Sequence, residues 1–180
     1  MNVIYTKAVL YAYSSIETVK KQIDDFIERR ALASMNDFSP CDEQCEIIIE
    51  HIAQKVILTQ LKSKIKAVLL SLKKEELDLL DYKYLKRKPK AYFKDIDTCS
   101  RSYYRKQKNL IKKISQRCDK VMLTDDWFEK NCLDINVIKW LVRRVERLEE
   151  SARRDINKKK VDNNTPDKAK KNENSLKMSA

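Results

Sequence analysis

Residues 73–118 read KKEELDLLDYKYLKRKPKAYFKDIDTCSRSYYRKQKNLIKKISQRC, and this stretch decides the fold that we predict. A first helix with an apolar face ends near Pro89, because proline stops a helix. A short second helix then precedes a break at Asp97-Thr98. A basic helix follows, and its predicted inner stripe is Tyr103, Gln107, Leu110, Ile111 and Ile114. Helix, short helix, turn and basic helix are typical of a helix-turn-helix, whose last helix enters a DNA major groove.

Positive charge is concentrated in this stretch. The chain has a net charge of +12, and residues 83–117 contain thirteen basic residues against two acidic ones, a net +11. A charge that served solubility alone would be spread along the chain. The concentration indicates a surface for phosphates or for an anionic membrane, and a solvated lysine-rich face is the alternative.

Composition favours an all-α fold. The 180 residues include no Gly and only 3 Pro, with 37% charged residues. Hairpin turns and phosphate-binding loops rely on Gly, so sheets and nucleotide sites are disfavoured. We predict a long N-terminal helical hairpin at 1–72, a helix-turn-helix domain at 73–118, a C-terminal helical segment at 119–154 and a disordered basic tail at 155–180.

The N-terminal segment predicts two amphipathic helices. One spans about residues 3–33, with a candidate break at Ser14-Ser15, and the apolar part before the break can pack elsewhere. The other runs from about Asp42 to Leu72, nearly continuous with the helix after it. Its predicted stripe is Cys45, Ile48, Ile49, Ile52, Val56, Leu61, Ile65, Val68 and Leu72. An antiparallel hairpin buries both stripes, and intermolecular coiled-coil pairing is the alternative.

The C-terminal segment predicts a capped turn and another amphipathic helix. Thr124 or Asp125 is the expected N-cap, with Trp127 and Phe128 as buried anchors. The helix over about 135–154 carries Ile138, Leu141, Val145, Leu148 and Ala152 at heptad spacing. It packs either on the hairpin or against a second copy of itself.

The five cysteines and the single histidine point away from a metal site or an enzyme. Five is an odd number, and Cys41 and Cys45 form an isolated CxxxC with no partner pair, so we expect free thiols in a reducing cytoplasm and no bound metal. No Gly-rich loop and no carboxylate cluster with catalytic spacing is present, and Cys99 has no base partner. We therefore expect a protein that is not an enzyme, has no cofactor and, lacking a long apolar run, has no membrane span.

The candidate DNA-binding residues lie on the outer face of the basic helix and in the cluster before it. Arg101 and Arg105 are four residues apart, and each can bind guanine in a bidentate manner. Tyr104 is expected to point outwards, and Tyr82, Tyr84, Tyr92 and Tyr103 to lie in the core. The full set is Ser100, Arg101, Ser102, Tyr104, Arg105, Lys108 and Lys112 on the helix, and Lys86, Arg87, Lys88 and Lys90 before it.

The run IDTCSRSYYRKQKNLIKKI resembles the recognition helix of ArpU- and RinA-type phage transcriptional regulators and of region four of bacterial sigma factors. The preceding LKKEELDLLDYKYLKRKP is similar to their first helix. The middle helix departs from the family pattern, with Asp97 where those proteins have Gly. The resemblance, over about residues 72–118, implies a promoter-binding regulator.

Two functions follow from these patterns. The first is a sequence-specific regulator that binds double-stranded DNA, with RNA polymerase and a homodimer through 135–154 or the hairpin as further candidate partners. The alternative is a helical interaction module that binds RNA polymerase or a phage component without reading DNA sequence.

Overall fold

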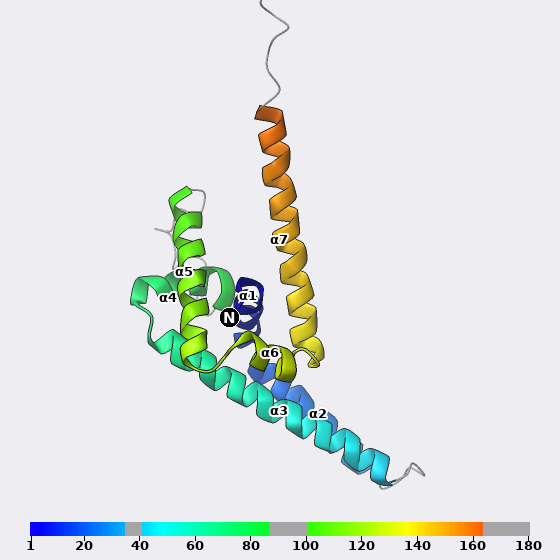
Figure 1. Cartoon of the computed structure of the whole chain (residues 1–180). Coiled ribbons are helices and arrows are strands. Elements are labelled where there is room, and N and C mark those ends of the chain that lie inside the picture. Colours follow the sequence, from blue (N-terminus) through cyan, green and yellow to red (C-terminus); the bar gives the residue numbers. More distant parts are fainter. Residues whose placement is uncertain (35–40, 87–100, 164–180) are drawn as a thin grey trace, which may run out of the picture. The chain divides into compact units, whose positions relative to one another are not determined.

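The computed structural model describes residues 1–34, 41–86 and 101–163. Within these ranges every regular element is a helix, so the prediction of an all-α fold is confirmed (Figure 1). Residues 1–145 form one compact unit and residues 146–180 a second, and each is described by itself below.

The first predicted helix is two helices, α1 (Val3–Tyr13) and α2 (Ile16–Ser34), separated at Ser14 and Ser15 where the sequence placed the candidate break. The side chain of Asn2 caps α1 by accepting a 2.9 Å hydrogen bond from the Ile4 amide. Much of α1 is buried because apolar residues occur on several of its sides, and it contacts α3, α5 and the turn after α4. A short, mostly apolar helix thus occupies the middle of the first unit.

Helix α3 (Cys41–Leu70) packs antiparallel against α2, as the hairpin prediction required (Figure 1). Two ion pairs join these helices, Glu17 to Lys62 at 2.7 Å and Asp24 to Lys55 at 2.5 Å. The two acids are seven residues apart along α2, and the two lysines are seven apart in the opposite direction along α3. The pairs therefore mark a constant antiparallel register.

The predicted inner stripe of α3 is wrong in its first half. Ile49, Ile52 and Val56 are 64%, 47% and 51% exposed, whereas Leu58 and Leu61 are buried. The step from Val56 to Leu61 is five residues, which turns a helix by about 140° at 3.6 residues per turn. The predicted stripe therefore changed faces at that step. Helix α3 carries two apolar faces, and only one lies against the rest of the unit.

Helices α3 and α4 (Lys74–Leu80) are separate, in contrast to the near-continuous helix that we predicted. The break is stabilised on both sides. The hydroxyl of Ser71 donates to the Val68 carbonyl at 2.6 Å, and the Lys73 amide donates to the Glu76 carboxylate at 3.0 Å. A π-helical turn, η1 (Asp81–Leu85), follows α4 and ends at Lys86 in the left-handed conformation.

Helix α5 (Arg101–Lys120) is followed by α6 (Asp125–Cys132). Met122 adopts the left-handed conformation after α5, and the Leu123 amide donates to the Cys118 carbonyl at 2.9 Å, which is a common way to end a helix. The Thr124 hydroxyl caps α6, accepting from the Trp127 amide at 3.2 Å as predicted. Phe128 is fully buried and Trp127 half-buried, so both serve as anchors.

Helix α7 (Asn136–Asn163) continues beyond residue 154, where the sequence predicted a disordered tail to begin. Residues 155–163 are helical in backbone, and residues 164–180 lie outside the described ranges. The start of α7 belongs to the first unit, where Ile138 and Val145 are buried in the core. Leu148 and Ala152, later in the predicted heptad stripe, are exposed.

One hydrophobic core serves the whole first unit. Residues 1–72, 73–118 and the part of 119–154 up to Val145 all contribute to it. Its fully buried side chains include Leu10, Ile16, Leu58, Leu61, Leu80, Leu85, Ile111, Ile114, Leu123, Phe128 and Ile138. The three predicted segments therefore share their interior.

Candidate nucleic-acid interface

The inner face of α5 matches the predicted stripe. Tyr103, Gln107 and Leu110 are buried, and so are Ile111, the next residue, and Ile114, about one turn further on. Successive residues on a helix are about 100° apart, so this burial fixes which residues of α5 point away from the core. The buried stripe therefore determines which side chains of α5 face solvent.

Four basic residues form a line along that outer face. Arg101, Arg105, Lys108 and Lys112 are all exposed, at steps of four, three and four residues that keep them on one side of the helix. We call these four residues the basic ridge. At about 1.5 Å per residue it extends roughly 16 Å, comparable with the ~12 Å width of a B-DNA major groove.

Two hydroxyl groups flank the ridge at its beginning. Tyr104 is 60% exposed, and its ring meets that of Tyr103 edge-on at 5.4 Å between centroids. Ser102 is exposed as well. A phenol and an alcohol beside arginines are donors that suit phosphate oxygens or base edges.

A buried polar chain holds the first turns of α5. The Lys83 ammonium donates to the Gln107 side-chain carbonyl at 2.7 Å, and the Gln107 amide donates to the Tyr103 hydroxyl at 3.1 Å. Burial raises the pKa of Tyr103, with the neighbouring Tyr82 adding to the rise, so its hydroxyl stays protonated at neutral pH. These bonds fix the rotation of α5 and hence the direction of the ridge.

An ion pair holds the middle of α5 to α4. The Lys113 ammonium lies 2.5 Å from the Glu76 carboxylate, and both side chains are partly covered. The hydrogen bond from Lys113 lowers the pKa of Glu76, and the Lys73 amide adds to the effect. Lys113 is thus engaged inside the unit and is not part of the outward surface.

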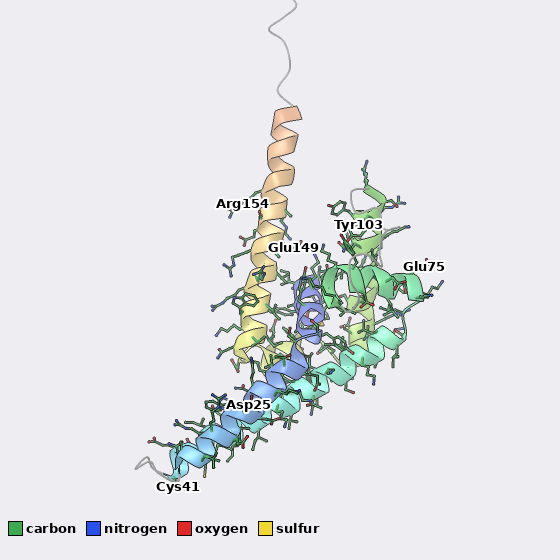
Figure 2. The ribbon with its side chains drawn as sticks, turned by 180° about the vertical axis from the view of Figure 1, so that it is seen from behind. Asp25, Cys41, Glu75, Tyr103, Glu149 and Arg154 are labelled. Atoms are coloured by element: carbon green, nitrogen blue, oxygen red, sulfur yellow. The ribbon has the colours of Figure 1, made fainter. Side chains whose placement is uncertain are left out.

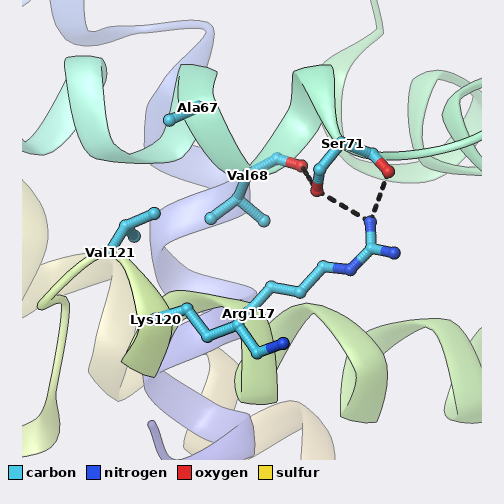
Figure 3. A pocket seen from close by; sticks show the side chains of 6 residues that line it. All are labelled: Ala67, Val68, Ser71, Arg117, Lys120 and Val121. Carbon is cyan, nitrogen blue, oxygen red and sulfur yellow. Dashed lines mark hydrogen bonds between the residues drawn. The ribbon is translucent and has the colours of Figure 1, made fainter.

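A third tie joins the C-terminal half of α5 to the end of α3, beside a pocket of about 310 Å³. Figure 3 shows the Arg117 guanidinium reaching Ser71, where it donates to the carbonyl at 2.6 Å and to the hydroxyl at 2.7 Å. The pocket is lined by Ala67, Val68, Ser71, Arg117, Lys120 and Val121. The guanidinium therefore bridges two helices, in contrast to those of Arg101 and Arg105.

The remaining candidate residues are only partly within the described ranges. Lys86 is exposed and follows η1 in the left-handed conformation. Arg87, Lys88, Lys90 and Ser100 lie outside the described residues, as do the predicted short helix, with Tyr92, and the turn at Asp97. Tyr84 and Tyr103 are buried, as their assignment to the core required, whereas Tyr82, which was assigned to the core as well, is only half-buried.

Charge counting alone did not separate outward cations from structural ones. Lys113 and Arg117 belong to the same basic run as the ridge, yet they bind Glu76 and Ser71. Position around α5 does not separate them either, because Lys106 lies on the same side of the helix as Lys113 and is exposed. What distinguishes Lys113 and Arg117 is an acceptor within reach, Glu76 on α4 and Ser71 after α3, which the sequence of α5 does not reveal.

No group of three or more potential metal ligands is found among the residues that the structure describes. In the same ranges, no helix has the length and apolar character needed to cross a bilayer. Comparison of the chain with protein-family models, with curated proteins and with solved structures found no match.

Proposed function

We propose that this protein is a sequence-specific DNA-binding transcription regulator that works in the cytoplasm and is not an enzyme. The observation that carries the proposal is the basic ridge, four exposed cations in line on a helix that is tied down on its opposite face. Such a helix presents positive charge without rearrangement, which favours docking against a phosphate backbone. The resemblance of residues 72–118 to phage regulators and to sigma region four supports a promoter as the target.

Within the ridge, the residues have different proposed roles. Arg101 and Arg105 are in the first two turns, the part of a recognition helix that reaches base edges. Lys108 and Lys112 are further along, where a lysine contacts phosphate as a point charge without reading sequence. Lys86, Arg87, Lys88, Lys90, Ser100, Ser102 and Tyr104 complete the proposed DNA-binding set.

The test is a comparison of variants on two DNAs. Sequences bound by the full-length protein are selected from a random pool, and affinities for a selected and a scrambled duplex are measured by fluorescence anisotropy. We expect Arg101→Ala and Arg105→Ala each to weaken the selected site by about 5- to 150-fold, equivalent to roughly 1–3 kcal/mol, and the scrambled duplex by less. Lys112→Ala weakens both alike and lowers the salt slope by about 0.9.

Lys21→Ala is the matched control, because Lys21 is an exposed lysine on α2 and its loss changes the net charge by the same amount. We expect it to leave both affinities nearly unchanged. Equal losses on both duplexes for all three ridge variants would refute the assignment of Arg101 and Arg105 as reading residues. Absence of duplex binding by the wild type would refute the function.

A helical interaction module is the second candidate function, and the exposed indole of Trp140 on α7 favours it, because aromatic side chains are enriched at protein interfaces. RNA polymerase or a phage component is then the proposed partner. The two functions are separable, since ridge variants impair only the first, whereas substitution of Trp140 impairs only the second.

A further inference from the structure

We infer that α3 binds a second copy of this chain in antiparallel orientation through its exposed face. This inference goes beyond the proposed DNA binding and does not rest on it. The face is a complete heptad seam, with successive steps of three and four residues. Its members are Asp42, Cys45, Ile49, Ile52, Val56, Thr59, Ser63 and Lys66, and all eight are exposed.

The seam lies on the side of α3 away from the buried core of the unit. Leu58, Leu61 and Ile65 occupy the opposite side and are buried, and the seam positions are about 180° from them around the helix. Alternation of three and four residues is the spacing that keeps a row of side chains facing a partner helix. A helix face that only meets solvent is normally polar, and it would not carry Ile49, Ile52 and Val56 at three successive positions.

The seam is self-complementary about its midpoint at residue 54. In an antiparallel pair Ile52 lies opposite Val56 of the second copy, and Ile49 lies opposite Thr59. Cys45 then meets Ser63. Each of these pairs joins residues of similar shape, two β-branched or two small, and each pairs an a position with a d position as antiparallel coiled coils require. A two-fold axis repeats every contact.

Charge decides the orientation. The beginning of α3 is acidic, with Asp42 at the start of the seam, and the exposed Lys66 lies at its other end. Three further lysines of α3 are engaged within the chain, because Lys55 and Lys62 pair with α2 and Lys64 donates to the Val121 and Met122 carbonyls. Antiparallel pairing places Asp42 opposite Lys66 at both ends of the seam, whereas parallel pairing places like charges together. Figure 2 shows Cys41, the first residue of α3 and the neighbour of Asp42, at one end of the hairpin.

The first test is the mass of the full-length protein as a function of concentration. Only three large aliphatic residues occupy the seam, so we expect a weak dimer. Light scattering from about 1 to about 100 µM should show a rise from 21.3 kDa toward twice that mass. Ile52→Asp should hold the mass at 21.3 kDa without unfolding the chain, because Ile52 is exposed. Thr18→Asp, an exposed site on α2 with the same charge change, should leave the dimer intact.

The second test is a disulfide between copies. In a chain with Cys41→Ser and Cys99→Ser, addition of Ser63→Cys should allow Cys45 to cross-link to residue 63 of the other copy under mild oxidation. Thr18→Cys in place of Ser63→Cys should give no cross-link. The background without a new cysteine should also remain uncross-linked, since the two Cys45 residues are far apart in the antiparallel pair.

Three results would overturn the inference. Cross-linking of the background through Cys45 alone would indicate a parallel dimer. A monomer at all concentrations, with Cys45 protected from alkylation, would show that another segment of the same chain covers the seam. A monomer at all concentrations with a reactive Cys45 would show that the seam is uncovered in the isolated protein, and its partner would then be a different protein.

Discussion

At the scale of single residues, burial separates the four thiols within the described ranges into two classes of reactivity. Cys118 and Cys132 are buried, and their burial raises the pKa of both thiols to about 12, so little thiolate exists at neutral pH. Cys41 and Cys45 are exposed at the far end of the hairpin. The same residue type therefore has a packing role in the core and a reactive one on the hairpin.

We expect iodoacetamide at neutral pH to modify Cys41 and Cys45 in dilute folded protein and to spare Cys118 and Cys132. Mass spectrometry of the digested protein gives the extent at each site, and the same reaction in urea is the control, in which all of these thiols react. The hydrogen bond with Cys41 raises the pKa of Cys45, so less thiolate exists at Cys45 at neutral pH and its modification should speed up as the pH is raised. Rapid modification of Cys118 in the folded protein would contradict the packed interior.

At the scale of elements, the ion pair between α4 and α5 links stability to pH. Lys113 lowers the pKa of Glu76 below its ordinary value of 4.5, so the folded state holds this proton less tightly than the unfolded state does. The stabilisation is therefore present above pH 4.5 and is lost as the pH falls through the lower folded-state pKa.

Glu76→Gln should lower the free energy of unfolding at pH 7 by up to about 1 kcal/mol, a modest effect because the pair is only partly covered. Glutamine keeps an oxygen for the Lys73 amide, so the change isolates the charge. Urea titrations followed by circular dichroism measure the difference from wild type, which should shrink as the pH drops below 4.5. The control is Glu75→Gln at the exposed neighbouring position. We expect this variant to have nearly the same free energy of unfolding as the wild type, both at neutral pH and in acid.

Also at this scale, α5 shows how far a sequence pattern reaches. Its charges are dense and its apolar residues few, so only one stripe can be buried, and Tyr103, Gln107, Leu110, Ile111 and Ile114 were correctly predicted. The direction of the outer face, with Arg101 and Arg105, follows from that stripe alone. What these arginines bind stays a prediction.

Helix α3 shows where the pattern fails. It has apolar residues on two faces, and periodicity cannot tell which face meets the hairpin partner when both satisfy helical spacing. Contacts with α2 settle the choice, through register-defining pairs such as Asp24 with Lys55. The break between α3 and α4 was also missed. No N-cap marks it in the sequence, because the Ser71 hydroxyl donates back to the Val68 carbonyl and does not cap the following helix.

At the scale of the whole molecule, the shared core predicts which truncations fold. Among the described residues the buried core ends at Val145, and a second unit begins at Glu146. A chain that ends at Val145 should unfold cooperatively with a midpoint within about 2–4 °C of the full chain, a shift that corresponds to roughly 1 kcal/mol. Thermal circular dichroism measures it.

A chain restricted to residues 73–118 is the informative comparison, because it lacks the α1 and α3 surfaces against which Leu110 and Ile114 are buried. We expect it to show no cooperative transition. If this fragment folded alone, the view that the three predicted segments depend on one interior would be wrong.

The central position of α1 also affects how the chain folds during synthesis. This helix is made before the rest of the first unit, yet the surfaces that cover it include η1 (Asp81–Leu85) and α5 (Arg101–Lys120), which are made much later. Its apolar residues, such as Val9 and Leu10, therefore remain without their native neighbours while most of the first unit is translated. We therefore expect α1 to offer chaperones a binding site in newly made chains, which the folded unit conceals.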